Sequence, residues 1–279
     1  MAGFVALLAA CAFGVATVLQ QKGTLEVPLP SDDPRFFAGL LRTPVWLLGG
    51  GLMVVGWVLQ AIALDLGPLV VVQPIIMLSL VIALPFGVWL TRQRVGRREW
   101  LAAAAAVVGL AVFVAVGNPA EGTQTGSTTV WVVSTLVVVG IVAALMVVQR
   151  VRHPKVSVTA VLFGTASGVC FGFQAAATKV FVDVVGGGLS AILSSWSTYA
   201  LIVSALLGFV LQQSALKTAV LAPAMASTNV ANMIVSVVLG AVVFEETLSH
   251  GSGTFAVAVA GLAVAVIAVV ALTRSEAPS

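Results

Sequence analysis

The sequence predicts an all-α polytopic membrane protein of about nine transmembrane helices, and three observations predict it. Of the 279 residues, 60% are hydrophobic and only 8% are charged, whereas a soluble domain typically carries about 25% charged residues. Uncharged runs recur along the whole chain, and about 20 apolar residues in a helix cross a hydrocarbon core of about 30 Å. The basic residues lie between these runs and almost all fall on one side.

The uncharged runs give nine candidate spans, most of them joined by short connectors. They are 3–21, 45–64, 69–91, 99–117, 130–149, 157–178, 189–211, 218–244 and 255–273. The second and third spans are separated by a four-residue turn that ends in Pro68, a residue suited to the start of a helix. The one long connector, 22–44, carries four prolines, so we expect it to be extended or turn-rich.

The distribution of charge predicts an orientation. Twelve of the thirteen lysines and arginines fall on one side of the alternating spans, and Lys179 alone falls on the other. Because lysine and arginine accumulate in cytoplasmic loops, the sequence predicts a multi-pass protein of the plasma (inner) membrane with its N-terminus outside and its C-terminus in the cytoplasm. The scatter of these residues argues against a nucleic-acid partner. Lys179 is expected to reach toward lipid headgroups, and Glu245 and Glu246 are expected to form a solvated turn.

The chain also repeats itself. The segment Gly-Trp-Val-Leu-Gln at 56–60 is echoed by Gly-Phe-Val-Leu-Gln at 208–212, and Phe13-Gly14 is echoed by Phe171-Gly172. Spans one to four therefore resemble spans six to nine.

This resemblance divides the chain into three parts. We predict a first four-helix repeat at 1–117, a linking helix with its loops at 118–156, and a second four-helix repeat at 157–279. Since related spans lie five apart, an odd number, the two repeats are inverted relative to each other in the membrane. Inverted repeats are typical of secondary transporters, whose binding site lies near the midplane between the copies.

Polar residues inside the spans are the candidates for a substrate-binding site, because such residues usually face a cavity or a neighbouring helix rather than lipid. Asn229, Asn232 and Ser236 share one helix face, and a proline within a span frees a backbone carbonyl one turn before it. The alternative is that these amides only join helix to helix, which is common. The candidates are Gln60, Gln73, Pro74, Ser79, Gln174, Pro223, Asn229, Asn232 and Ser236.

No catalytic, cofactor-binding or metal-binding residue is expected, and we predict that the protein is not an enzyme. His153 and His250 both lie in connectors, so an intramembrane hydrolase that depends on histidine would lack its base. No Gly-Lys pair offers a Walker A loop, and Cys11 and Cys170 lie in separate apolar runs. The expected cofactor is none.

A stripe of glycines predicts a close-packing face on one span. Gly164, Gly168 and Gly172 recur every four residues, which aligns them along one side of a helix. Faces of this kind serve internal packing and self-association alike, so a homodimer stays open.

Several short motifs resemble the drug/metabolite transporter superfamily. The motifs are Phe13-Gly14 leading into Leu19–Gly23, Ala63-Leu64 leading to Gln73-Pro74, Ser79-Leu80, and Glu245–Leu248. The nine-span layout is most similar to NIPA-like magnesium transporters, and the Glu245 loop is similar to the EamA-like group. EamA-like members usually have ten helices as five plus five, so one helix is missing here. The first-copy loop also departs, because it reads Arg92-Gln93-Arg94 where a glutamate is often found.

The resemblance and the repeat imply a secondary transporter or facilitator that works by alternating access, with a small-molecule substrate and the lipid bilayer as its partners. Magnesium usually needs one or two carboxylates, and the acidic residues here lie at span ends. Amide-lined cavities suit small polar, zwitterionic or amphiphilic metabolites, including lipid-linked ones, so we expect such a cargo first and a divalent cation second. A third hypothesis is a non-transporting scaffold or accessory subunit of an envelope-assembly enzyme, which would lack a polar cavity between the repeats.

Overall fold

The fold is known from a computed structural model. It describes residues 1–91 except 31, 32 and 34, residues 126–152, 154–218 and 221–246, and short stretches between 97 and 122 and between 256 and 267. Every element in this part of the chain is a helix, as expected where the backbone must satisfy its own hydrogen bonds in lipid. Seven segments are long and apolar enough to cross a membrane, so the chain is a multi-pass membrane protein.

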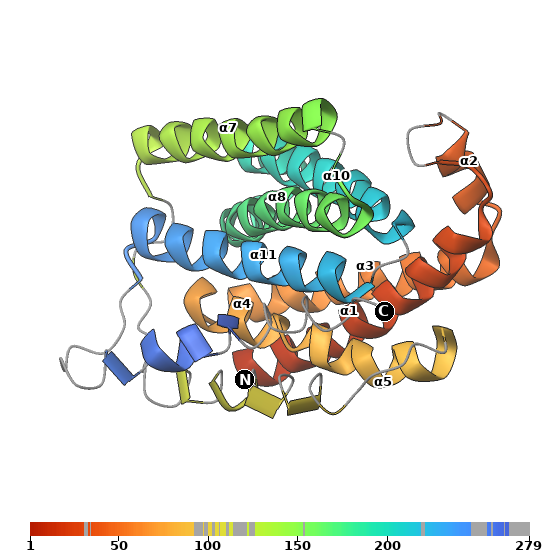
Figure 1. The fold of residues 1–279 in the computed structure, drawn as a ribbon. Helices are drawn as coiled ribbons and strands as arrows, with labels where there is room; N and C mark the ends of the chain where they lie inside the picture. Colours follow the sequence, from red (N-terminus) through yellow and green to blue (C-terminus); the bar gives the residue numbers. More distant parts are fainter. Residues whose placement is uncertain are drawn as a thin grey trace.

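The helices follow one another along the chain with short connections (Figure 1). They are α1 (Ala2–Glu26), α2 (Phe36–Leu40), α3 (Pro44–Asp65), α4 (Leu69–Ile76), α5 (Ser79–Thr91), α7 (Thr128–Arg152), α8 (Val156–Val185), α9 (Gly188–Ser194), α10 (Trp196–Lys217) and α11 (Leu221–Val243). Helices α4 and α5 together form one crossing segment, Leu69–Leu90.

Seven of the nine predicted spans are confirmed as helices that can cross a membrane. The other two, 99–117 and 255–273, fall about half outside the described residues, and both histidines, the 92–94 loop and residues 247–248 lie outside them. The count of nine and the division into three parts therefore stay predictions.

Several predicted boundaries are wrong, and α8 continues to Val185, seven residues beyond the end expected at 178. The span expected at 189–211 is interrupted at Ser195, whose hydroxyl accepts a hydrogen bond from the Ser197 N–H and so caps the start of α10. As a result α10 begins at Trp196 and continues to Lys217, beyond the expected end of the span. The connector 22–44 is also less extended than expected, because α1 continues to Glu26 and α2 forms within it.

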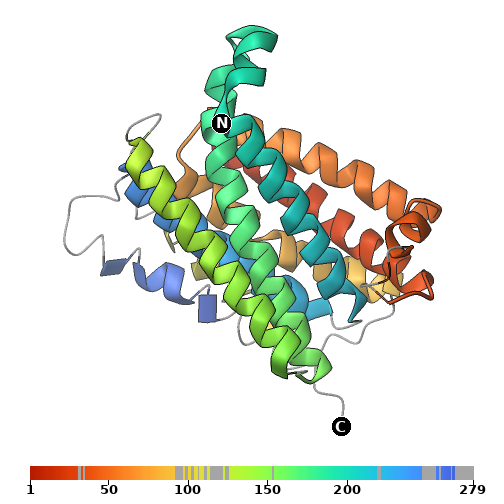
Figure 2. The ribbon, with the colours of Figure 1, turned by 90° about the horizontal axis from the view of Figure 1, so that it is seen from above.

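The membrane-crossing helices pack in two groups (Figure 1). In the first group, α1 packs mainly against α3 and also against α4 and α5. In the second, α8 packs against α10 and α11. Helix α7 lies on the outside, against α8, as Figure 2 also shows. Only 11% of its most apolar stretch is buried, so most of its surface is left for lipid.

Close helix contacts depend on glycines at equivalent places in the two groups. A Cβ atom on Gly56 would lie 2.6 Å from the ring of Phe13, and one on Gly208 would lie 2.9 Å from the ring of Phe171. These are the residues by which the two halves of the sequence resemble each other. The predicted close-packing face of α8 is confirmed as well, because a Cβ on Gly168 would lie 2.2 Å from the backbone oxygen of Thr228 in α11.

Contacts between the groups fix the directions of their helices. Trp46, near the start of α3, donates through Nε1 to Oε1 of Gln213, near the end of α10, over 3.0 Å. The backbone N–H groups of Leu69 and Val70, at the start of α4, donate to the carboxylate of Glu246, just after the end of α11. Helix α3 therefore runs opposite to α10, and α4 opposite to α11, which is what an inverted repeat requires.

Candidate functional site

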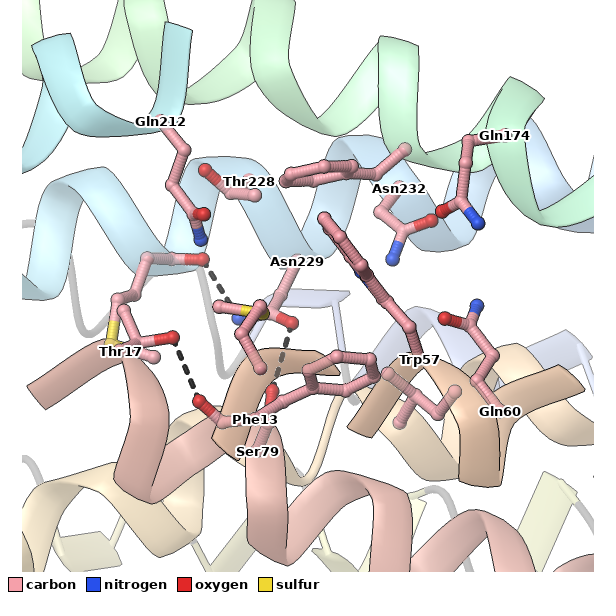
Figure 3. Close-up of a pocket in the computed structure, with 14 residues that line it drawn as sticks. Phe13, Thr17, Trp57, Gln60, Ser79, Gln174, Gln212, Thr228, Asn229 and Asn232 are labelled. Atoms are coloured by element: carbon pink, nitrogen blue, oxygen red, sulfur yellow. Dashed lines mark hydrogen bonds between the residues drawn. The ribbon is translucent and has the colours of Figure 1, made fainter. Parts of the chain in front are cut away.

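A small cavity lies between the two helix groups, and both groups line it (Figure 3). Its volume is about 50 Å³. Its walls come from α1, α3, α4 and α5 on one side and from α8, α10 and α11 on the other. The lining residues are Phe13, Thr17, Met53, Trp57, Gln60, Ile76, Ser79, Phe171, Gln174, Gln212, Met225, Thr228, Asn229 and Asn232.

Five of the predicted site residues line this cavity. They are Gln60, Ser79, Gln174, Asn229 and Asn232. Gln60 comes from the first group and Gln174 from the second, and Figure 3 shows their amides pointing toward each other across the space. The structure thus brings together residues that are up to 172 positions apart in the chain, from Gln60 to Asn232.

The other four predicted residues are not among the lining residues of the cavity. Ser236 joins helices instead, because its hydroxyl hydrogen-bonds to Asn232 Oδ1 and to the backbone oxygen of Gly172. Pro74 and Pro223 are buried in α4 and α11. Gln73 is 1% exposed, and neither its amide nitrogen nor its amide oxygen has a hydrogen-bond partner in the described part of the chain.

Sequence reasoning missed three polar lining residues, Thr17, Gln212 and Thr228. The repeat offered a signal for Gln212, because it is the counterpart of Gln60. The same signal would have found Phe171 as the counterpart of Phe13, which lines the cavity too. The expected span boundary at 211 places Gln212 just outside the membrane, which kept it from the candidates despite its equivalence to Gln60.

Hydrogen bonds fix most of the polar side chains around the cavity. Ser79 donates through its hydroxyl to Asn229 Oδ1 over 3.1 Å, and Asn229 Nδ2 donates to the backbone oxygen of Met225 over 2.9 Å. This pair joins α5 to α11 across the boundary between the groups. The hydroxyls of Thr17 and Thr228 donate to backbone oxygens of their own helices. Their protons are therefore engaged, and their oxygen lone pairs remain available.

The lining is neutral and rich in oxygen. Eight of the lining residues carry a side-chain amide or hydroxyl, and among the described residues around the cavity none is charged. The buried oxygen of Gln212, Oε1, has no hydrogen-bond partner there. An unpartnered buried acceptor is unfavourable by about 1–3 kcal/mol, so a cation or a hydrogen-bond donor placed beside it would relieve that cost.

The volume limits what the cavity can hold in this conformation. A water molecule needs at least about 10–15 Å³ of such space, so about 50 Å³ accommodates a few waters or a small ion with part of its hydration shell. Drug-sized ligands occupy about 300–1,000 Å³. In the described part of the chain no group of three or more His, Cys, Asp or Glu side chains could hold a metal ion, so any cation here would meet neutral oxygens.

The two helix groups are joined by different interactions at the two ends of the bundle, on either side of the cavity. At one end the side chain of Glu246 is completely buried and forms an ion pair with Lys179 of α8. The expectations of a solvated turn at Glu246 and of a Lys179 that reaches toward headgroups are therefore wrong. At the other end Gln213 of α10 binds α1 and α3 through neutral hydrogen bonds. We refer to these as the Glu246 end and the Gln213 end.

Two known proteins resemble the chain over most of its length. An uncharacterized protein of Corynebacterium glutamicum is 28% identical over 275 residues, which cover 97% of this chain and 94% of that protein. The probable magnesium transporter NIPA9 of Arabidopsis thaliana is 25% identical over 255 residues, which cover 87% of this chain and 73% of that protein. No family model matches the chain, and no solved structure matches it. Together with the membrane-crossing helices, the likeness to the plant protein supports a membrane transporter in general terms.

Proposed function

We propose that the protein is a membrane transporter that carries a small hydrated cation, with Mg²⁺ as the leading candidate, through the cavity between its two helix groups. The observation that carries the proposal is the small, neutral, oxygen-lined space at the boundary of the groups. The 25% identity to a probable magnesium transporter supports the choice of cation. The amides alone favoured a metabolite. Because the cavity volume is only about 50 Å³, we now rank the cation first.

Neutral oxygens suit a transport site for this ion. Mg²⁺ loses its water reluctantly and keeps several waters when bound, so amide and hydroxyl oxygens can hold it by accepting hydrogen bonds from those waters. A transported ion must also be released, so its binding has to be favourable without being tight. A site without carboxylates in its lining meets both conditions.

The arrangement of the helices supports alternating access. The opposite directions of α3 and α10, and of α4 and α11, fit two inverted repeats that rock around a fixed central site. The drug/metabolite transporter resemblance, the plasma membrane location and the N-terminus-outside orientation belong to this proposal. In that orientation the Glu246 end faces outward and the Gln213 end faces the cytoplasm.

A small polar metabolite is the second candidate. It is favoured by the absence of a carboxylate among the described lining residues, since proteins usually bind Mg²⁺ through one or two carboxylates. The accessory-subunit hypothesis is weakened, because it expects no polar cavity between the repeats.

Reconstituted protein tests the proposal. Proteoliposomes that contain a magnesium-sensitive dye should take up Mg²⁺, and replacing both Asn229 and Asn232 with Ala should slow uptake by about tenfold or more, because a hydrogen bond to a charged ligand contributes about 1.5–3 kcal/mol. Gln149→Ala, which removes an amide from the outer helix α7, is the matched control and should transport normally.

A parallel set of vesicles should be offered labelled amino acids. Accumulation of amino acids without Mg²⁺ uptake would establish the second candidate in place of the first. Equal Mg²⁺ uptake by the double variant and the control would remove the cavity as the transport site.

A further inference from the structure

Glu246 is buried and fully hydrogen-bonded, unlike a glutamate in an exposed turn. Its side chain is fully buried, and both carboxylate oxygens are engaged: Oε1 accepts from the Leu69 N–H and from Lys179 Nζ, and Oε2 accepts from the Val70 N–H. Both backbone distances are 2.9 Å. The carboxylate therefore neutralises an ammonium group and caps the start of α4, where the helix dipole favours a negative charge.

The local backbone is built to bring the carboxylate inward. Glu245 has φ of +55°, in the left-handed region, and this bends the chain back at the end of α11. The Glu246 N–H then donates to the backbone oxygen of Gly240 over 3.0 Å. A Cβ on Gly240 would lie 2.7 Å from Glu246 Oε2, so the glycine leaves the space that the carboxylate fills.

Glu246 joins the two helix groups at the end of the bundle where a cation would arrive. Helix α4 belongs to the first group, whereas Lys179 and Glu246 belong to the second. Along α4, Leu69 contacts Glu246, the unpartnered amide of Gln73 follows one turn later, and Ile76 lines the cavity. Seven helical residues span about 10 Å, so the carboxylate and the cavity lie about two turns apart along α4.

Lys179 occupies the place that a cation would take. Its ammonium group contacts Glu246 and lies 5.1 Å from the centre of the Phe244 ring, and its side chain is 13% exposed. A divalent ion at the same distance attracts a carboxylate twice as strongly as an ammonium group does. Mg²⁺ is commonly held by one or two carboxylates, and Glu246 supplies one at this end of the bundle.

We infer that Glu246 is the first binding site of the transported cation, and that an arriving divalent cation displaces the Lys179 ammonium from Glu246 and so opens the Glu246 end. The inference rests on the proposed function. The bound cation neutralises the carboxylate charge that held Lys179, and the long lysine side chain turns toward the headgroups. The cation then passes the amide of Gln73 and reaches the oxygen-lined cavity.

The test measures opening directly, by the reactivity of a cysteine placed at Gln73. A Gln73→Cys variant is made in a Cys11→Ser background, because Cys11 is exposed and would react as well. Cys170 is buried and is retained. Mg²⁺ should accelerate labelling by a polar thiol reagent about tenfold compared with K⁺ at equal ionic strength. Adding Glu246→Gln, which keeps the shape and removes the charge, should abolish this acceleration.

Controls separate the charge of Glu246 from general loosening. Glu245→Gln changes the neighbouring, exposed acid and should preserve the acceleration by Mg²⁺. Lys179→Met removes the ammonium whose departure opens this end, so labelling should already be about tenfold faster than in the parent without Mg²⁺, and Mg²⁺ should add little. Size-exclusion profiles identify any variant that fails to fold. If Glu246→Gln fails, Glu246→Asp takes its place. It keeps the charge but shortens the side chain, so it should shift the Mg²⁺ concentration at which labelling accelerates.

The outcomes distinguish this inference from the proposed function. Mg²⁺ uptake by the wild type together with equal acceleration in the Glu246→Gln variant would overturn the inference and leave the proposed function standing. Absence of uptake by the wild type together with absence of acceleration in the Gln73→Cys parent would overturn the proposed function itself.

Discussion

Replacing Gln213 with Leu should lower the free energy of unfolding by about 3 kcal/mol, among the largest effects expected of one side chain. Gln213 is completely buried and bridges three partners: Oε1 accepts from Trp46 Nε1 at 3.0 Å and from Thr24 Oγ1 at 3.2 Å, and Nε2 donates to Gln20 Oε1 at 3.0 Å. Leucine fills the space but leaves all three groups buried and unpaired. Each such group costs about 1–3 kcal/mol, toward the lower end inside a membrane.

Thermal unfolding in detergent measures this effect. The apparent Tm of Gln213→Leu should fall by roughly 5–10 °C. The matched control is Gln212→Leu, the same change at the adjacent residue, where Oε1 has no partner among the described residues. Its Tm should stay within about 2 °C of the wild type. Equal losses in the two variants would contradict a special role for the Gln213 bridge.

Gly168→Ala should cost about 3 kcal/mol and also slow transport, because this glycine sets the distance between α8 and α11. The added Cβ would lie 2.2 Å from the backbone oxygen of Thr228 and 2.9 Å from the backbone nitrogen of Asn232. Backbone atoms cannot rotate away, so the helices must separate, and overpacking of this kind costs about 1–3 kcal/mol, occasionally more. Since α11 carries Asn229 and Asn232, the separation also displaces the cavity wall.

The control for this change is Gly140→Ala in α7. A Cβ there has no atom within 4 Å, so alanine should be neutral or slightly stabilising. Unfolding temperature and Mg²⁺ uptake should be measured on both variants. A Gly168→Ala protein with wild-type stability would show that α8 and α11 can accommodate a methyl group at this contact, and would contradict the prediction.

The features that the sequence predicts well are local or periodic. The glycine stripe of α8, the shared face of Asn229 and Asn232, and the pairing of Phe13 with Phe171 all follow from spacing within one helix or from comparison of two segments. These patterns were sufficient to place five of nine candidate residues around one cavity. Helix boundaries follow less well from the sequence, because α8 and α10 continue beyond their expected ends and Ser195 interrupts one expected span.

The features that the sequence hides depend on residues far apart in the chain. Glu246 meets Leu69 across 177 positions, and its burial depends on a left-handed backbone at Glu245 and on the absence of a side chain at Gly240. A glutamate in a short loop is ordinarily solvated, and no periodicity marks the exception. Gln213 is hidden for a similar reason, because its partners belong to α1 and α3 and lie more than 160 positions away.

The peripheral helix α7 has a consequence for the direction of the second helix group. It packs against α8 and contributes no lining residue to the cavity, yet it crosses the membrane once between the two groups. Each crossing reverses the side of the membrane from which the next helix starts. Without α7, α8 would start from the opposite side, and every helix of the second group would run in the reverse direction. Trp46 and Gln213 would then lie in opposite leaflets, as would Leu69 and Glu246. Helix α7 therefore matters less for its side chains than for its one crossing, which keeps the partners of each contact between the groups in the same leaflet.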